Sequence, residues 1–184
     1  MQRLLRDLLL VGLITATAGC AGPDSDPQQG EDLPSPAGGS THEYAYLEDE
    51  VQHLLEFLRG TAPLREGLLA DTVALYIAPD GGGEKVSMAA SVLGSPSAWR
   101  VASYSLTPPE DYGHATITPG LHFNCQPVNL ETLYPELARF PHVGVRLAID
   151  EGATCLQTWN LTFVFNEDAE APRLTAVVYD QWEW

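Results

Sequence analysis

Residues 143–184 alternate apolar and polar side chains, and this pattern constrains the fold more than any other feature of the chain. Apolar residues occupy every second position in two segments: Val143, Val145, Leu147 and Ile149, then Trp159, Leu161, Phe163 and Phe165. Successive side chains of a β-strand point to opposite faces, so each segment predicts a strand with one buried face. Residues 173–183 predict a third strand after an acidic loop. The whole region therefore predicts a three-strand antiparallel meander.

A second pattern, with the 3.6-residue period of an α-helix, occurs before the strands. Five apolar residues fall on one helical face: Leu47, Val51, Leu54, Leu55 and Leu58. Ser40 and Glu43 fit a capping box at the start, and Gly60 fits a left-handed stop at the end. Such a stripe must face a core, so the segment predicts an amphipathic helix packed on the sheet. His53 lies beside the stripe, where a boundary position is expected rather than a ligand.

The middle of the chain predicts shorter elements. Four segments predict strands from their composition and the turn residues around them: 73–78, 84–86, 99–106 and 114–125. Three segments predict short helices: 63–70, 87–94 and 129–140. Pro119 and Gly120 break the last strand. Pro135 either divides the last helix into two short pieces or begins it.

This order of elements predicts an α+β fold, in which the N-terminal amphipathic helix packs on a curved, mostly antiparallel sheet ending in the meander. Two N-terminal helices, followed by antiparallel strands with an inserted helix, resemble the nuclear-transport-factor-2-like superfamily, which has a small cone-shaped fold. The resemblance rests on element order alone. It implies a cavity between the helices and the curved sheet, used by different members for binding or for catalysis.

The first 20 residues have the layout of a secretory signal, with Arg3 and Arg6 before an apolar run from Leu8 to Ala18. As a helix this run is about 16 Å long, whereas the hydrocarbon core of a bilayer is about 30 Å thick. The run is therefore too short for a permanent membrane anchor.

The end of the run, Thr17-Ala18-Gly19-Cys20, resembles the lipobox of bacterial lipoproteins, although Thr17 stands where that family prefers Leu. The resemblance implies that residues 1–19 are a signal peptide and that Cys20 is lipidated on sulfur as the mature N-terminus. The alternative is a plain signal peptide. Ala21 differs from the Asp that retains such proteins at an inner membrane. The expected location is the cell membrane or outer membrane, with the domain outside the cytoplasm.

Residues 21–40 contain four Pro, four Gly and four acidic residues but one large apolar residue, Leu33. This composition cannot form a packed core, and as a flexible tether it would span about 25 Å. The chain is therefore predicted to have three parts: a signal peptide (1–19), a lipidated Cys with an acidic tether (20–40) and a single globular α+β domain (41–184).

Lipidation of Cys20 would leave Cys125 and Cys155 as the remaining cysteines. In an exported chain such a pair predicts a disulfide, which would contribute about 3 to 4 kcal/mol to the stability of the fold. Two buried free thiols are the alternative. The pair lacks Cys-x-x-Cys spacing, so no metal site is expected from it.

The charge balance limits the partners of the protein. The chain carries 25 acidic and 9 basic side chains, a net charge of −16, and the part from Thr41 onward keeps 20 acidic and 7 basic ones. This balance argues against nucleic-acid binding and predicts a solvated acidic surface. The common motifs for phosphate binding, serine nucleophiles, metalloprotease zinc and dinucleotides are absent. No cofactor is expected.

Three histidines are weighed as ligands: His114, His122 and His142. His114 and His122 flank the Pro119-Gly120 turn and would approach each other if that turn reversed the chain. A zinc site needs three or four converging ligands, so solvent-facing or core-edge positions are expected and no metal is predicted.

The C-terminal strand places Asp180, Trp182 and Trp184 on one face. If that face is buried, Asp180 becomes a candidate general base with His122 or His142 as its partner. The simpler interpretation is that Asp180 accepts hydrogen bonds while the tryptophans seal the core. Exposed tryptophans would instead bind a sugar ring or a protein partner.

The sequence therefore favours a non-catalytic, membrane-anchored envelope lipoprotein. Its membrane contact would be the lipid on Cys20, and its domain would bind a small molecule, a glycan or a neighbouring protein. The alternative is a small anchored enzyme that uses a cavity carboxylate and a histidine in a cone-shaped α+β fold. That alternative requires Asp180, His122 and His142 to converge around an open pocket. A purely structural role as a spacer also fits the sequence.

Overall fold

The computed structural model describes residues 43–77, 84–123, 130–154 and 157–179. Within them the chain forms an α+β fold with one six-stranded mixed sheet and few helices. The strands are β1 (Leu69–Ile77), β2 (Glu84–Ala89), β3 (His114–Pro119), β4 (His142–Ala148), β5 (Thr158–Phe165) and β6 (Leu174–Tyr179). The helices are α1 (Glu48–Leu58), α2 (Pro96–Ala102), α3 (Leu130–Leu133) and α4 (Pro135–Ala138), with 3-10 turns at Ala45–Leu47 and Tyr104–Leu106.

The strand order in the sheet is β2-β1-β6-β5-β4-β3. β4, β5 and β6 are consecutive antiparallel neighbours, which is the meander that the alternation of apolar residues predicts. β3 is antiparallel to β4, and β2 is antiparallel to β1. The sheet is mixed because β1 runs parallel to β6, and this pair joins the N-terminal hairpin to the C-terminal meander.

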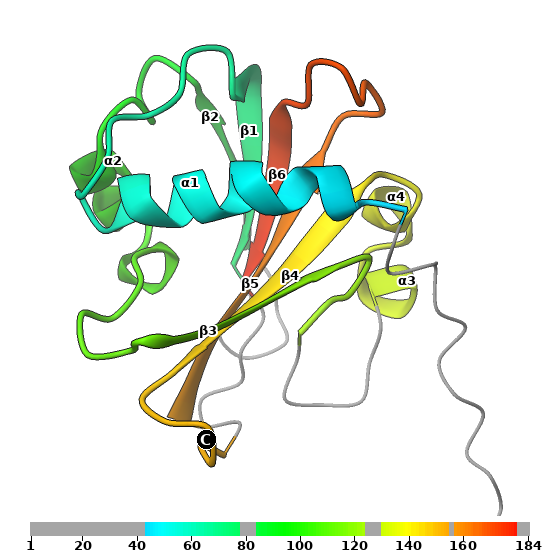
Figure 1. The fold of residues 1–184 in the computed structure, drawn as a ribbon. Helices are drawn as coiled ribbons and strands as arrows, with labels where there is room; N and C mark the ends of the chain where they lie inside the picture. The colour runs from blue at the N-terminus through cyan, green and yellow to red at the C-terminus, as the bar shows by residue number, and fades with distance from the viewer. Residues whose placement is uncertain (1–42, 78–83, 124–129, 155–156, 180–184) are drawn as a thin grey trace, which may run out of the picture. The chain divides into compact units, whose positions relative to one another are not determined.

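Helix α1 lies across one face of the sheet (Figure 1). Its buried side chains are Val51, Leu54, Leu55, Phe57 and Leu58. Three acidic residues in its first turn interact favourably with the positive, N-terminal end of the helix dipole. The helix begins at Glu48 after a 3-10 turn, with Leu47 as its N-cap, so Glu43 is not in its first turn, and Ser40 lies outside the described residues. Gly60, with φ of 75°, forms the left-handed stop.

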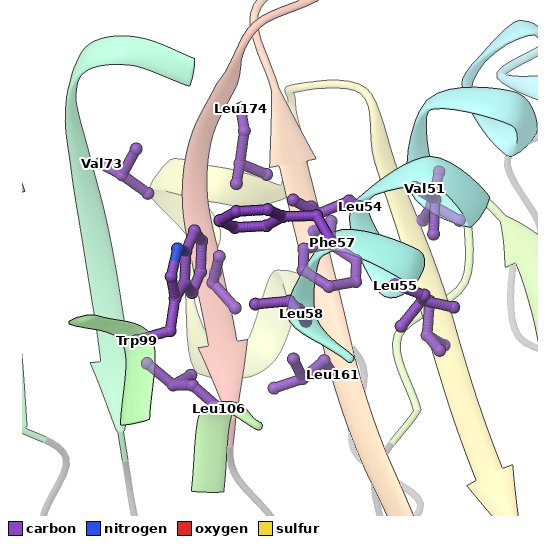
Figure 2. Close-up of a cluster of buried hydrophobic side chains, with 14 of the residues drawn as sticks. Val51, Leu54, Leu55, Phe57, Leu58, Val73, Trp99, Leu106, Leu161 and Leu174 are labelled. Carbon is purple, nitrogen blue, oxygen red and sulfur yellow. The ribbon is translucent and has the colours of Figure 1, made fainter. Parts of the chain in front are cut away.

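Large side chains fill the core between α1 and the sheet. Figure 2 shows the Phe57 ring pointing from α1 toward the Trp99 indole and Leu174, and Phe57 is only 2% exposed. The buried indole N–H of Trp99 donates to the carbonyl oxygen of Leu93 at 2.9 Å. Trp159 on β5 donates in the same way to the carbonyl oxygen of Ser105 at 2.7 Å. Both indoles therefore bury their rings without leaving the N–H unsatisfied.

A smaller apolar cluster covers part of the opposite face of the sheet, beneath α3 and α4. Its buried members are Tyr76, Leu130, Leu137, Val164, Ala176 and Val178. Pro135 begins α4 directly after Tyr134, so the proline divides the helical pattern into two short pieces, as one of the two predictions stated. Strand β5 is consequently buried at every position from Thr158 to Phe165.

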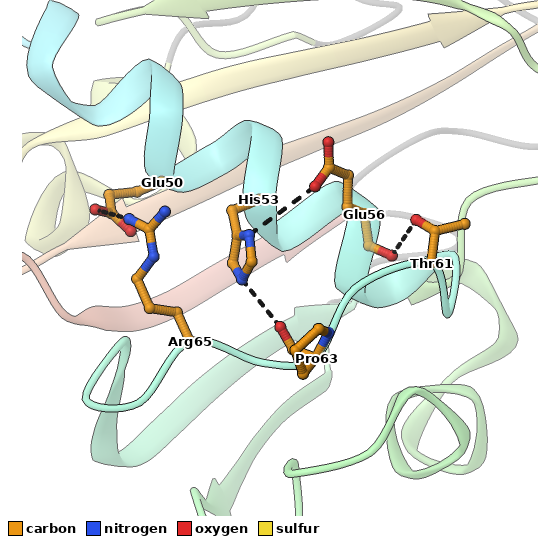
Figure 3. Close-up of polar contacts among 6 residues, drawn as sticks. All are labelled: Glu50, His53, Glu56, Thr61, Pro63 and Arg65. Carbon is orange, nitrogen blue, oxygen red and sulfur yellow. Dashed lines mark hydrogen bonds and ion pairs between the residues drawn. The ribbon is translucent and has the colours of Figure 1, made fainter.

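The helix predicted for residues 63–70 is wrong. Gly67 adopts a φ of 78°, which ends any helical path, and β1 begins two residues later at Leu69. Polar contacts tie this loop to α1 instead (Figure 3). His53 Nε2 donates to the carbonyl oxygen of Pro63 at 2.9 Å, and Arg65 pairs with Glu50. His53 is thus a half-buried residue at the boundary of the core, and its ring connects α1 to the loop that follows.

The region from residue 87 to 106 also differs from its prediction. Residues 87–89 continue β2, because Val86 and Met88 pair with β1. The strand predicted for residues 99–106 is instead α2 followed by a 3-10 turn. Pro96 at the first turn suits a helix, and a helix directs Trp99 inward to bond Leu93. Burial of the indole outweighs the strand propensity of the local sequence.

We predict that Phe57→Ala lowers the free energy of unfolding by about 3 to 5 kcal/mol, because it leaves a cavity at the centre of the core. Urea unfolding followed by circular dichroism measures this change. Val92→Ala is the matched control, because Val92 is 51% exposed and its truncation should change the free energy by less than about 0.5 kcal/mol. Equal effects of the two substitutions would contradict the assigned core.

Candidate functional site

A row of polar side chains lies buried on the face of β5 that points away from α1. The row consists of Thr158, Asn160 and Thr162, and Asn160 is only 2% exposed. Buried polar groups cost free energy unless they are hydrogen-bonded. Asn160 Nδ2 donates to Thr158 Oγ1 at 3.1 Å, while its Oδ1 accepts from Arg146 Nε at 3.2 Å. The row therefore forms a polar network with β4.

The chain after β3 folds back over this network. It turns at Gly120, whose φ is 70° and whose N–H donates to the carbonyl oxygen of His142 at 2.7 Å. Residues 121–123 then cross Gly144. A Cβ at that position would collide with the Leu121 carbonyl oxygen and lie 2.9 Å from the Phe123 ring. Glycine on β4 is thus required for the close approach, and sequence reasoning missed this role.

The crossing segment brings two of the predicted histidines to the same face of the sheet. His122 Nδ1 lies 2.6 Å from Thr162 Oγ1 on β5. His142, at the start of β4, donates its Nδ1 proton to the carbonyl oxygen of Phe140 at 2.9 Å. His114 pairs with Ala148, at the other end of β4. The turn at Pro119-Gly120 therefore directs His122 toward His142 rather than toward His114.

The surroundings of His142 favour its neutral form. Burial of the imidazole is the largest cause and lowers the pKa of His142 below its usual 6.5, and the charge of His122 lowers it further. The carbonyl groups of Phe140 and Gly120 and the charge of Glu131 oppose this shift without reversing it. A neutral imidazole at pH 7 has one ring nitrogen available to accept a proton.

The other sequence-predicted candidates lie outside the described residues: Cys20, Cys125, Cys155, Asp180, Trp182 and Trp184. The convergence of Asp180 with His122 and His142 therefore stays a prediction. Among the described residues, no group of three or more His, Cys, Asp or Glu side chains is placed to hold a metal ion. The chemistry that this part of the chain supports is proton acceptance by the half-buried imidazole of His142, near that of His122.

A second candidate region is a hollow of about 230 Å³, located where α1 ends beside α2. It is lined by Leu58, Arg59, Gly60, Pro96, Ser97, Arg100 and Thr107. Figure 1 shows α2 beside the C-terminal end of α1. Sequence reasoning missed this hollow because its two halves are far apart in the chain and neither contains a recognisable motif. The wrong strand prediction for residues 99–106 also hid the helical position of Arg100.

Comparison with known protein families, with curated proteins and with solved structures gives no match for this chain. In the part of the chain that the structure describes, no helix has the length and apolar character needed to cross a bilayer.

We predict that His142 lowers the stability of the fold in mild acid. The pKa of His142 is lower in the folded chain than in the unfolded chain. As the pH falls from about 6.5 toward the folded pKa, the unfolded chain therefore binds more protons than the folded chain does. The free energy of unfolding should be independent of this group above that window and decrease within it. Nuclear magnetic resonance titration of the imidazole measures the pKa, and urea unfolding between about pH 5 and 7.5 measures the stability.

His142→Gln should flatten this pH dependence, because it removes the imidazole whose pKa is lowered in the fold. A midpoint for His142 at or above 6.5 would contradict the assigned burial.

Proposed function

We propose that this protein is a lipid-anchored binding protein of the bacterial envelope. Its location would be the cell membrane or outer membrane, with the folded domain outside the cytoplasm. Support comes from the secretory layout of residues 1–20, from the lipobox-like end at Cys20 and from the acidic tether that follows. A tether of about 25 Å is long enough to hold a domain clear of the lipid headgroups.

The hollow between α1 and α2 is the observation that carries the binding part of this proposal. Ligand sites are concave and combine apolar walls with a few convergent polar groups. This hollow combines the side chains of Leu58 and Pro96 with two arginines and two hydroxyl-bearing residues. Its members come from both helices and from the chain after α2, so the tertiary fold alone brings them together.

The finer fold assignment stays a prediction. The nuclear-transport-factor-2-like resemblance implies a cavity between the helices and the curved sheet. In the described residues Phe57, Trp99 and Leu161 fill the space between α1 and the sheet, and each is at most 2% exposed. A binding site at the end of α1 therefore suits this chain better than one beneath the helix.

We predict that Cys20→Ser releases the protein from the membrane fraction, because the substitution removes the sulfur that would carry the lipid. Lipid chains contribute about 0.8 kcal/mol of membrane affinity for each buried CH₂ group. Cell fractionation with immunoblotting measures the release, and intact-mass spectrometry measures the modification. Ser25→Ala, in the tether, is the matched control and should stay in the membrane fraction. A wild-type protein that is soluble with an unmodified Cys20 would overturn the anchor.

We also propose a disulfide between Cys125 and Cys155, which both lie outside the described residues. The described residues near them support it. Phe123 lies over Arg146 on β4, and Thr158 pairs with β4 two residues farther along the same strand. The chain on both sides of the proposed bridge thus reaches the same part of the sheet.

The disulfide predicts that neither Cys125 nor Cys155 reacts with iodoacetamide in the unfolded, unreduced chain, and that both react after reduction. Peptide mass spectrometry distinguishes the two states. Reduction should also lower the free energy of unfolding by about 3 to 4 kcal/mol. Alkylation of both cysteines without reduction would refute the bridge.

A small anchored enzyme is the second candidate function. The observation in its favour is that His142 is held neutral beside His122, which suits a general base. It also requires Asp180 to reach the same place. The titration of His142 bears on this candidate directly, because an imidazole that titrates in the ordinary range would remove the observation on which it depends.

A further inference from the structure

Basic side chains are few in this domain, and most of them are engaged. Seven occur from residue 41 onward, against 20 acidic ones. Arg65 forms an ion pair with Glu50, and three others lie over aromatic rings: Lys85, Arg139 and Arg146. Arg59 and Arg100 form no ion pair with a carboxylate of the described residues, and both line the hollow. Two arginines without a carboxylate partner among the described residues therefore line one hollow of an acidic domain.

The contacts around the hollow hold one of these arginines in place. Arg59 Nη2 donates to the carbonyl oxygen of Tyr112 at 2.8 Å, which uses one of the five guanidinium N–H donors. Arg100, on α2, is exposed and has all its donors available within the described structure. One guanidinium is thus preorganised and the other is able to adjust to a ligand.

Two other residues that line the hollow, Ser97 and Thr107, carry hydroxyl groups. Ser97 Oγ lies 3.1 Å from Ser95 Oγ. The Oγ1 of Thr107 is buried and has no hydrogen-bond partner among the described residues. Buried polar atoms without a partner are uncommon in native proteins. Because this oxygen is buried, Thr107 would have to rotate its side chain to bond a ligand oxygen in the hollow.

We propose that the hollow binds the oxyanion group of a small ligand, either a phosphate or a carboxylate, through Arg59 and Arg100. This inference rests on the proposed binding function and names its ligand class. Guanidinium groups match the geometry of both oxyanions and form charge-assisted hydrogen bonds with them. The C-terminal end of α1 contributes about half a negative charge, which the two arginines exceed. A volume of about 230 Å³ restricts the site to a compact ligand.

Amide chemical shifts of the purified full chain in neutral detergent micelles test this proposal. The probes are inorganic phosphate, succinate and, as a neutral ligand, glucose. Saturable shifts are expected for Gly60, Ser97 and Thr107 with at least one of the two oxyanions, and none with glucose. Gly152 is the distant reference. Comparison of the phosphate and succinate titrations identifies which oxyanion the site prefers.

Arg100→Gln should weaken oxyanion binding about 10- to 100-fold, because it removes a charge-assisted contact. Arg59→Gln should weaken it comparably, and its spectrum also checks the fold, since this variant loses the bond to Tyr112. Arg173→Gln is the matched control. It replaces an exposed arginine that does not line the hollow and should leave the affinity unchanged.

Equal weakening by Arg173→Gln and Arg100→Gln would overturn the assigned site. Shifts with glucose but with neither oxyanion would overturn the oxyanion class and leave the binding function standing. No shifts with any of the three probes would overturn the inference and also remove the hollow as support for the proposed function. Membrane anchoring through Cys20 is measured separately and does not depend on this result.

Discussion

Strand β5 is buried on both faces along its whole length, and the rest of the structure depends on covering it. Its apolar face, with Leu161 and Phe163, packs in the core beneath α1 and α2. Its other face begins with buried polar side chains and ends with Val164, so it needs hydrogen-bond partners at one end and apolar cover at the other. The network of Arg146 and His122 satisfies the first need, and α3 and α4 supply the second.

The two candidate regions lie in different parts of the domain. The histidines lie on the face of the sheet opposite α1, because the segment after β3 reaches that face across Gly144. The hollow lies where α1 ends beside α2. A role for His142 in proton transfer and a role for Arg59 and Arg100 in oxyanion binding are therefore independent of each other. Four of the other five basic side chains from residue 41 onward form an ion pair or lie over an aromatic ring.

Sequence reasoning succeeded where one periodic pattern coincides with one buried face. Alternation over residues 143–165 predicts β4 and β5, and Pro135 predicts either a divided helix or a helix that begins there, of which the structure has two short helices with α4 beginning at the proline. It failed at residues 63–70 and 99–106, where the pattern is short. In both places packing in the tertiary structure decides the conformation. The positive φ of Gly67 turns the chain into β1. The helical conformation of α2 places the Trp99 indole in the core. The parallel pairing of β1 with β6 also has no local signal.

The sequence alone determines the α+β class, the antiparallel meander and the chemical character of the N-terminal 40 residues, because each depends on composition or on spacing along the chain. His122 and His142 are also identifiable from sequence as residues capable of proton transfer. Tertiary structure alone decides that these two lie together at one end of β4 while His114 lies at the other end, and that Arg59 and Arg100 line one hollow. The physical reason is that such juxtapositions depend on strand order and helix packing between segments that are distant in the chain, which no local pattern encodes.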